Sequence, residues 1–246
     1  MLFFGKKKSS SPSIDLSWLG ADMHSHLIPG IDDGSPDMAT SIELIKGLSQ
    51  LGYKKLITTP HVLWDVYPNT SQQIIDGLTV LQNAVKEADI DIEIGAAAEY
   101  FIDEHFEEDI KHKVPLLPIS GNMVLVEFSM ITAPMDLQQI LFEVQIQGYQ
   151  PVIAHPERYI YLQNRKEFFT ELKEAGCLFQ LNLLSLTGHY GRSVQELAEY
   201  LCKNDYYHLA GTDLHGVRHL DGLQKLTSSS TFQRLKESGL LKNASL

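Results

Sequence analysis

The chain has 246 residues, and 43% of them are hydrophobic, which is enough to bury a sizeable core. Acidic residues outnumber basic residues by 31 to 20, giving a formal net charge of -11, and no basic cluster extends beyond residues 6–8. This charge distribution argues against a nucleic-acid partner. No apolar run reaches the roughly 20 residues of a membrane-spanning helix, so we expect no stable insertion into a membrane.

Residues 1–19 differ in composition from the rest of the chain. A short apolar start is followed by three lysines and a run of serine and proline, which is typical of a disordered arm rather than of a signal peptide. We therefore predict a disordered N-terminal arm over residues 1–19 and one domain over residues 20–246. The two cysteines, Cys177 and Cys202, form no CxxC pair; this suits a reducing compartment, and we expect a cytoplasmic protein.

From about residue 20, short β-rich runs alternate with helix-length amphipathic stretches. The predicted strands cover residues 21–26, 55–59, 92–97, 123–127, 151–154, 177–181 and 207–210. Ser35 and Pro36 form the pattern of an N-cap followed by proline at the first helical position, which predicts a helix that continues to Leu51. Three glycines stand where helices should end before the next strand: Gly52, Gly148 and Gly176. These βα units predict an α/β fold with a single parallel barrel.

Histidines and acidic residues recur where the predicted strands end. The residues concerned are His24, His26, His61, Glu99, Glu127, His155, Asp213 and His215. Because the C-terminal ends of barrel strands open on one face, these side chains should converge there although they lie far apart in the sequence. A single strand-end histidine is usually a structural residue, but five of the ten histidines occupy such positions. This concentration favours a shared site fed by six of the seven predicted strands.

The spacing of these residues points to metal binding. Two residues separated by one position on an extended strand point the same way, so His24 and His26 can reach one ion, and Asp213 and His215 repeat the spacing. A mixture of imidazole and carboxylate without thiolate suits Zn, Mn or Fe, and several carboxylates that could bridge ions favour a multinuclear centre.

The ordered set of motifs resembles the PHP (polymerase and histidinol phosphatase) superfamily over about residues 20–225. The motifs are Asp22-Met23-His24-Ser25-His26, Asp32-Asp33-Gly34, Thr59-Pro60-His61, Ala98-Glu99-Tyr100, Val126-Glu127-Phe128-Ser129, Ile153-Ala154-His155-Pro156-Glu157-Arg158 and Thr212-Asp213-Leu214-His215. Within the superfamily, the chain is most similar to the bacterial manganese-dependent tyrosine phosphatases associated with capsule and exopolysaccharide synthesis.

The resemblance implies a distorted (β/α)7 TIM-like barrel, the PHP fold, that holds three divalent metal ions. We expect these ions to be Mn²⁺, with Fe or Zn as alternatives. The implied ligand groups are His24, His26, Glu99 and Asp213; Glu99, Glu127 and His155; and Asp33, His61 and His215. Asp33 enters only through the resemblance, because the sequence Asp32-Asp33-Gly34 would otherwise predict a turn.

Two arginines are predicted to bind phosphate. Arg158 matches the phosphate-binding arginine of such enzymes, and its planar guanidinium suits two phosphate oxygens. A second arginine is expected after the Asp-x-His motif, and Arg218 is the candidate, although its spacing from that motif departs from the family pattern.

The resemblance implies that the chain is a phosphomonoester hydrolase acting on phosphotyrosine in a protein. The expected substrate is the tyrosine-rich tail of a membrane-bound bacterial tyrosine kinase that controls polysaccharide synthesis. A cysteine-based mechanism is excluded, because Leu183 and His208 stand where an arginine would have to follow the two cysteines. Two alternatives stay open: a small-molecule phosphatase such as a histidinol-phosphate phosphatase, and a non-catalytic metal-binding module.

Overall fold

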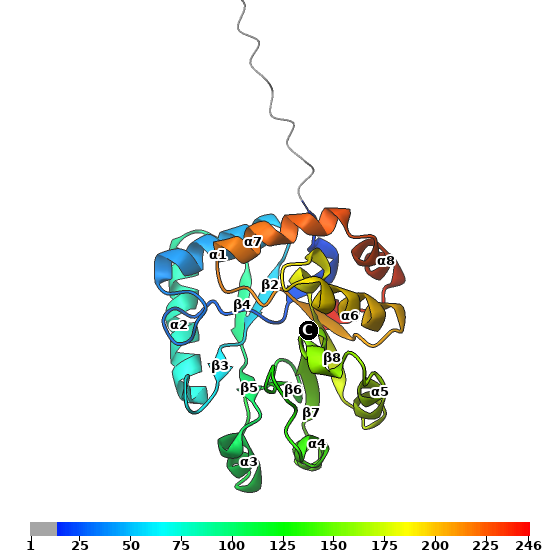
Figure 1. The fold of residues 1–246 in the computed structure, drawn as a ribbon. Coiled ribbons are helices and arrows are strands. Elements are labelled where there is room, and N and C mark those ends of the chain that lie inside the picture. Colours follow the sequence, from blue (N-terminus) through cyan, green and yellow to red (C-terminus); the bar gives the residue numbers. More distant parts are fainter. Residues whose placement is uncertain (1–13) are drawn as a thin grey trace, which may run out of the picture.

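Parallel strands form the centre of the molecule, and helices surround them (Figure 1). The computed structural model describes residues 14–246. One sheet has the strand order β1-β2-β4 and the other the order β3-β5-β6-β7-β8-β9, with every neighbouring pair parallel. The strands are β1 (Ala21–Asp22), β2 (Lys55–Thr58), β3 (His61–Val62), β4 (Glu93–Ala96), β5 (Glu99–Phe101), β6 (Met123–Glu127), β7 (Gln150–Ala154), β8 (Leu178–Asn182) and β9 (Leu209–Gly211).

The described part of the chain has eight α-helices, of which six lie between strands and two follow β9. They are α1 (Met38–Gln50), α2 (Ser71–Glu87), α3 (Glu104–Lys111), α4 (Leu137–Ile146), α5 (Glu167–Glu174), α6 (Arg192–Lys203), α7 (Val217–Leu223) and α8 (Ser230–Ser238). The prediction of an α/β fold with a curled parallel sheet is confirmed, and each predicted strand overlaps an observed one. No helix among residues 14–246 is long and apolar enough to cross a membrane.

The second predicted strand is followed after a short break by another strand, β3, which the sequence pattern did not indicate. Thr59 and Pro60 separate β2 from β3, and Pro60 has no N–H to donate to a neighbouring strand. Its carbonyl nevertheless accepts the N–H of Glu99 at 3.1 Å, so pairing continues across the break. As a result, β3 and β5 start side by side, with His61 directly opposite Glu99.

A few hydrogen bonds join the first strand to the last, at what we call the β1–β9 junction. The N–H of Asp213 donates to the carbonyl of His24 at 2.7 Å, and the N–H of His26 donates to the carbonyl of Leu214 at 3.0 Å. Ser25 also forms a parallel bridge with Leu214. These bonds place His24 and His26 beside Asp213 although almost the whole domain separates them in sequence.

The C-terminal end of the chain completes this junction. Asn243 is buried, and its side-chain amide donates to the carbonyls of Ala21 at 3.0 Å and Ala210 at 2.6 Å. Its side-chain oxygen accepts the N–H of Ala210 at 2.9 Å. A single asparagine therefore supplies hydrogen bonds that paired strands would otherwise exchange.

The predicted helix ends are right in part. Gly52, Gly148 and Gly176 have φ of 102°, 89° and 87°, the left-handed backbone expected after a helix. The predicted N-cap at Ser35 is wrong, because the helix begins two residues later. Asp37 is the N-cap, and its carboxylate accepts the N–H of Thr40 at 2.8 Å.

The prediction of a disordered arm over residues 1–19 is wrong for its described part. Ile14, Leu16 and Leu19 are buried in the core, and the N–H of Leu16 donates to the carbonyl of Leu51 at 2.7 Å. Their apolar side chains alternate with polar residues, so one face of this segment packs against the domain. The rest of the predicted arm, residues 1–13, lies outside the described residues.

Candidate metal centre

The nine predicted metal ligands converge at the C-terminal ends of the strands. Among the described residues, their donor atoms form four groups in which all chosen atoms lie within 4.8 Å of one another. The groups are His26, Asp33, His61 and His215; His24, His26 and Asp213; His24, Glu99 and His155; and His61, Glu99 and Glu127. Overlapping groups of this kind suit a multinuclear metal centre.

Glu99 lies at the middle of the cluster. Its Oε2 atom is 3.1 Å from Nε2 of His24, 3.2 Å from Nδ1 of His61 and 3.5 Å from Nε2 of His26. Its Oε1 atom is 3.1 Å from Nε2 of His155. The two oxygens therefore face different histidines, as a carboxylate that bridges two metal ions would.

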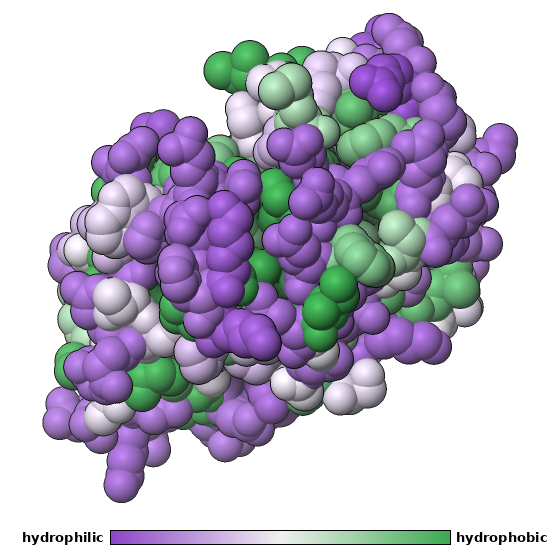
Figure 2. Space-filling view, turned by 90° about the horizontal axis from the view of Figure 1, so that it is seen from below, coloured by the Kyte–Doolittle hydropathy of each residue, from purple (hydrophilic) through white to green (hydrophobic). Residues whose placement is uncertain are grey.

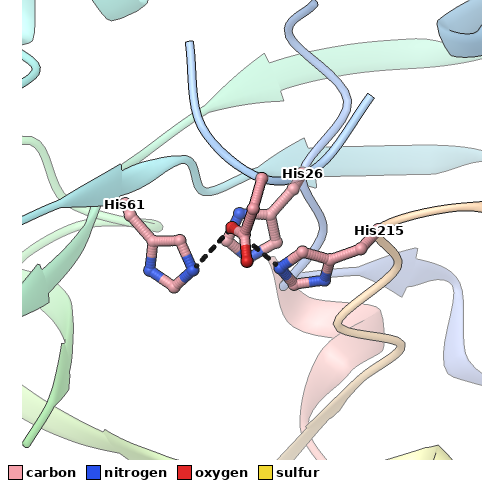
Figure 3. Close-up of side chains that lie close together, drawn as sticks. His26, His61 and His215 are labelled. Atoms are coloured by element: carbon pink, nitrogen blue, oxygen red, sulfur yellow. Dashed lines mark ion pairs between the residues drawn. The ribbon is translucent and has the colours of Figure 1, made fainter. Parts of the chain in front are cut away.

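Asp33 and two histidines form the more open side of the cluster. Figure 3 shows His26, His61 and His215 around a carboxylate, with ion pairs drawn to His61 and His215. Oδ1 of Asp33 lies 3.4 Å from Nε2 of His61 and 3.5 Å from Nε2 of His215. The Asp33 side chain is 55% exposed, whereas that of Glu99 is fully buried. A substrate can therefore approach the cluster from the Asp33 side.

His61 takes part in two groups rather than in one. Its Nε2 faces Asp33, as the resemblance implies, but its Nδ1 lies 3.2 Å from Glu99 and 3.1 Å from Glu127. One imidazole thus stands between the open and the buried parts of the cluster. The geometry brings all nine residues together, while the grouping of His61 differs from the implied one.

The two histidines that follow β1 are held by partners outside the ligand set. Nδ1 of His26 lies 2.7 Å from Oδ2 of Asp32, and Nδ1 of His24 lies 3.0 Å from Oε1 of Gln180. Because these partners engage Nδ1, both Nε2 atoms are left facing the carboxylates of the site. Such partners fix the orientation and tautomer of metal-binding histidines.

The sixth predicted strand, which seemed to contribute no site residue, supplies two. Gln180 and Asn182 lie at the end of β8 and are buried. The Asn182 amide donates to Oδ2 of Asp213 at 2.8 Å. Their signal is visible in the sequence as two polar residues separated by one position on an otherwise apolar strand, the same spacing as His24 and His26.

Two candidate ligands have left-handed backbones. His155 has φ of 33° and Asp213 has φ of 50°, which is unusual for residues with a Cβ atom. His155 follows directly after β7, Asp213 lies two residues after the end of β9, and both side chains lie in the cluster. Strain of this kind, about 1–3 kcal/mol per residue, collects at functional sites.

Gly34 explains why the Asp32-Asp33 loop can lie so close to the first strand. A Cβ atom at Gly34 would stand 2.3 Å from Cβ of His26, so no other residue fits without a shift. The N–H of Gly34 also donates to Oδ1 of Asp32 at 2.9 Å. The sequence Asp32-Asp33-Gly34 therefore forms a loop, as its composition suggests, and this loop also carries the site residue Asp33 that the resemblance implies.

The charges of the cluster stabilise one another. Burial would lower the pKa of His24, but the carboxylates of Glu99 and Asp213 raise it above its ordinary value. Burial would also lower the pKa of His61, but the pKa rises to about 10, mainly because of the Glu99 carboxylate. The pKa of Glu99 is held well below its usual range against burial by His24 and His61. Metal binding must then displace protons, so metal affinity should rise with pH.

The cluster fits divalent metal ions. The buried atoms His61 Nδ1, His155 Nδ1 and Glu99 Oε2 have no hydrogen-bond partner among the described residues. Orphaned buried polar atoms are costly unless something satisfies them. Borderline imidazole nitrogens and hard carboxylate oxygens in one cluster are the donors that Mn, Fe and Zn accept.

Arg158, the predicted phosphate-binding arginine, lies at the edge of the cluster. It belongs to the 3-10 turn Pro156–Arg158, which follows β7, and its Nη1 is 3.2 Å from Oδ2 of Asp213. Its guanidinium also packs over the ring of Tyr190, 4.7 Å from the ring centre. These contacts hold the arginine at the edge of the cluster with donors left over for a ligand.

Arg218 is the one predicted site residue that the structure brings neither to the cluster nor to the cavity beside it. It is exposed on the first turn of α7 and does not line the cavity next to the cluster. Successive helical residues point in different directions, so its neighbour His219 turns inward instead. Nδ1 of His219 lies 3.3 Å from the backbone N–H nitrogen of His215.

A cavity of about 530 Å³ opens beside the cluster. Its polar lining comes from Asp33, His61, Glu127, Arg158, Asp213, His215 and His219. Its apolar and aromatic lining comes from Leu63, Tyr67, Phe101, Met130 and Tyr190. One side can therefore hold an anion with metal ions, and the other can contact an aromatic ring.

Replacing Asp32 by asparagine tests the support of His26. We expect Asp32→Asn to weaken metal binding by about 10- to 100-fold, the usual effect of removing a partner of a metal-binding histidine. The side chain keeps its size, so the fold should persist. Titration of the metal-free protein with Mn²⁺ measures the change, and unaltered affinity would mean that Asp32 does not position His26.

Comparison with known proteins agrees with this site. A model of the family described as capsular polysaccharide synthesis, CpsB/CapC, matches residues 20–228. The tyrosine-protein phosphatase YwqE of Bacillus subtilis is 29% identical over 197 residues, covering 80% of this chain and 78% of that protein. The tyrosine-protein phosphatase CpsB of Streptococcus pneumoniae is 28% identical over 202 residues, covering 80% of this chain and 83% of that protein.

Solved structures show the same relationship. A crystal structure described under YwqE from Bacillus subtilis and CpsB from Streptococcus pneumoniae, metal-dependent tyrosine phosphatases, superposes with a TM-score of 0.77 and 28% identity, covering 91% of this chain and 94% of that chain. An amidohydrolase from Mycoplasma synoviae shares the fold, with a TM-score of 0.52, 15% identity, and coverage of 94% and 85%. The family match spans most of the chain, and the chain belongs to the CpsB/CapC family of capsular polysaccharide synthesis proteins.

Proposed function

We propose that this chain is a metal-dependent protein-tyrosine phosphatase. The observation that carries the proposal is the cluster of nine imidazole and carboxylate side chains beside Arg158, in a chain whose relatives are named tyrosine-protein phosphatases. Phosphate monoesters resist hydrolysis strongly, so the site must both provide a nucleophile and neutralise the transferring group.

The nine residues would hold three divalent ions, with Mn²⁺ as the expected metal and Fe or Zn as alternatives. His24, His26, Glu99 and Asp213 would surround one ion. Glu99 with Glu127 and His155 would surround a second, and Asp33, His61 and His215 a third. When bound, the metal ions supply an activated water and offset negative charge on the phosphoryl group.

The side chains that line the cavity would position the substrate. Arg158 would donate hydrogen bonds to two phosphate oxygens, and its contact with Asp213 and Tyr190 keeps the guanidinium in place. The walls formed by Tyr67, Phe101 and Met130 would contact the phenyl ring. Neither cysteine serves as nucleophile: Cys177 is buried, which raises the pKa of its thiol to about 12.

The curled sheet is best described as a distorted (β/α)7 barrel. Counting β2 with β3 and β4 with β5 as interrupted strands gives seven, and the β1–β9 junction supports closure between the first and the last. In such a barrel the C-terminal strand ends form the site.

The substrate would be a phosphotyrosine protein. Membership of a capsular polysaccharide synthesis family supports the tyrosine-rich tail of a membrane-bound bacterial tyrosine kinase as that substrate. Both cysteines are free, which supports a reducing, cytoplasmic location for the reaction.

Metal removal tests the proposal. We expect chelator-treated protein to lose phosphatase activity on a phosphotyrosine peptide and Mn²⁺ to restore it, because no protein side chain here can replace the activated water. Metal analysis of the active sample should give up to three ions per chain. Full turnover by metal-free protein would contradict the mechanism.

Histidinol phosphate in the same assay separates the alternatives. Preference for histidinol phosphate over the phosphotyrosine peptide would favour the small-molecule phosphatase. Metal binding without turnover of either substrate would favour a non-catalytic module.

A further inference from the structure

A second cavity lies next to the metal centre and has no role in the chemistry proposed above. Its volume is about 650 Å³. It is lined by Thr132, Ala133, Pro134, Met135, Asp136, Leu137, Gln138, Gln139, Tyr161, Leu162, Arg165, Phe168 and Glu171. We call it the side groove. One wall is the loop after β6 with the start of α4, and the other is the segment that leads into α5.

The side groove and the metal-site cavity are lined by neighbouring stretches of the chain on two walls. Met130 lines the metal-site cavity and Thr132 lines the side groove, so only Ile131 separates the two along this loop. On the opposite wall, Arg158 lines the first cavity and Tyr161 the second. The hydroxyl of Tyr161 donates to the carbonyl of Ser129 at 3.0 Å and ties the two walls together. A polypeptide bound at the metal-site cavity could therefore extend over this link to the side groove.

Several exposed apolar side chains lie on or next to the segments that line the two cavities. Ile131 is 85% exposed, Met135 is 99% exposed and Ile160 is 49% exposed. Figure 2, which views the molecule from the side of α3 and α4, shows hydrophobic side chains lying among hydrophilic ones on this face. Clustered exposed apolar residues of this kind mark surfaces that bind a polypeptide.

Arg165 is a positively charged side chain that lines the side groove. Within residues 14–246 its guanidinium makes no ion pair and donates no hydrogen bond, although it lies near the ring of Phe168, 5.8 Å from the ring centre. Two carboxylates, Asp136 and Glu171, line the same groove, and Glu171 accepts a hydrogen bond from the Gln138 amide at 2.9 Å. The guanidinium of Arg165 keeps its donors available for a carboxylate of a bound polypeptide.

We propose that the side groove binds the part of the substrate polypeptide that flanks the phosphotyrosine, taking an apolar side chain beside Ile131 and Met135 and an acidic side chain at Arg165. This inference rests on the proposed phosphatase function and adds a determinant of substrate choice to it. The metal-site cavity selects the phosphorylated ring, and the side groove selects its sequence context. A small phosphate ester occupies only the first cavity.

Two matched peptides test the inference. In both peptides, two residues flank the phosphotyrosine on each side. They are leucine and glutamate in the first peptide, and both are alanine in the second. With Mn²⁺ present, we expect the wild-type chain to hydrolyse the first peptide with a kcat/KM about tenfold higher, mainly through a lower KM. p-Nitrophenyl phosphate serves as the small substrate.

Variants then assign the preference to the side groove. Arg165→Glu and the double variant Ile131→Ser with Met135→Ser should each reduce the preference to about threefold or less, while kcat/KM for p-nitrophenyl phosphate stays within about twofold. Two control variants change exposed side chains elsewhere. Arg234→Glu, on α8, makes the same charge change, and Val80→Ser, on α2, removes a comparable apolar side chain. Both controls should keep the wild-type preference.

The outcomes separate a failure of the side-groove inference from a failure of the proposed phosphatase function. Equal hydrolysis of both peptides by the wild-type chain would overturn the side-groove inference and leave the phosphatase function standing. Absence of turnover with every substrate would instead overturn the proposed function. A wild-type dimer that dissociates in the double variant would show that a second copy of the chain covers these residues, and would also overturn the inference.

Discussion

Glu99→Gln is expected to abolish most phosphatase activity while the protein remains folded. Glu99 is fully buried, and its two oxygens face His24, His26 and His61 on one side and His155 on the other. Glutamine keeps the shape but removes the charge that would lie between two metal ions. Removing even an outer partner of a ligand typically costs 10- to 100-fold, so losing a bridging ligand should reduce kcat/KM by more than about a hundredfold.

Metal content and activity should be measured on the same purified Glu99→Gln sample. We expect at least one ion per chain to be lost or to bind more weakly. Glu87→Gln, at an exposed position on α2, is the matched control and should change neither quantity. Unchanged stoichiometry and turnover in Glu99→Gln would show that Glu99 is not a ligand.

Arg158→Ala is expected to separate phosphate binding from metal binding. Arg158 contacts Asp213 but is not placed as a ligand, and Asp213 keeps its hydrogen bond from Asn182 when the arginine is removed. The metal count should therefore stay the same. Charge-assisted hydrogen bonds contribute roughly 1.5–3 kcal/mol each, so losing one or two predicts a fall in kcat/KM of about ten- to several-hundredfold.

Lysine at this position should recover only part of the loss, because an ammonium restores charge without the paired hydrogen bonds of a guanidinium. Inorganic phosphate should inhibit Arg158→Ala less well than it inhibits the wild-type chain. Arg218→Ala is the natural comparison: Arg218 is exposed outside the cavity, so its loss should leave kcat/KM within about twofold. Loss of metal from Arg158→Ala would make the residue structural rather than substrate-binding.

Much of the site could be predicted because parallel strands end on one face. Once residues 21–26, 55–59 and 207–210 are recognised as strands, His24, His61 and Asp213 must approach one another. The pattern requires only the alternation of β-rich and helical stretches, which local composition provides. The convergence of these side chains is observed; their role as metal ligands stays a proposal.

The residues that escaped prediction depend on contacts between distant segments. The spacing of Gln180 and Asn182 on an apolar strand marks them as unusual, but it does not reveal that they bond to His24 and Asp213. Arg218 is predicted from the resemblance, as the arginine after the Asp-x-His motif, but the direction of a helical side chain depends on where the helix begins. The sequence therefore predicts which strand ends come together better than it predicts which neighbouring residues support the site.

The edges of the domain were also hard to predict, for a related reason. Residues 14–19 look like part of a polar arm, yet Ile14 and Leu16 pack into the core because α1 and the last helices provide an apolar surface for them. Likewise, nothing local marks Asn243 as a buried residue. Both segments acquire their structure only from the completed domain.

The position of Asn243 has a consequence for how the protein is made. His24 and His26 leave the ribosome early, whereas Asp213 and His215 follow near the end of synthesis, and the hydrogen bonds of Asn243 to Ala21 and Ala210 form later still. A growing chain thus carries the early histidines of the cluster for most of its synthesis without their late partners. The complete cluster can form only after Asn243 has been made and the first and final strands have come together.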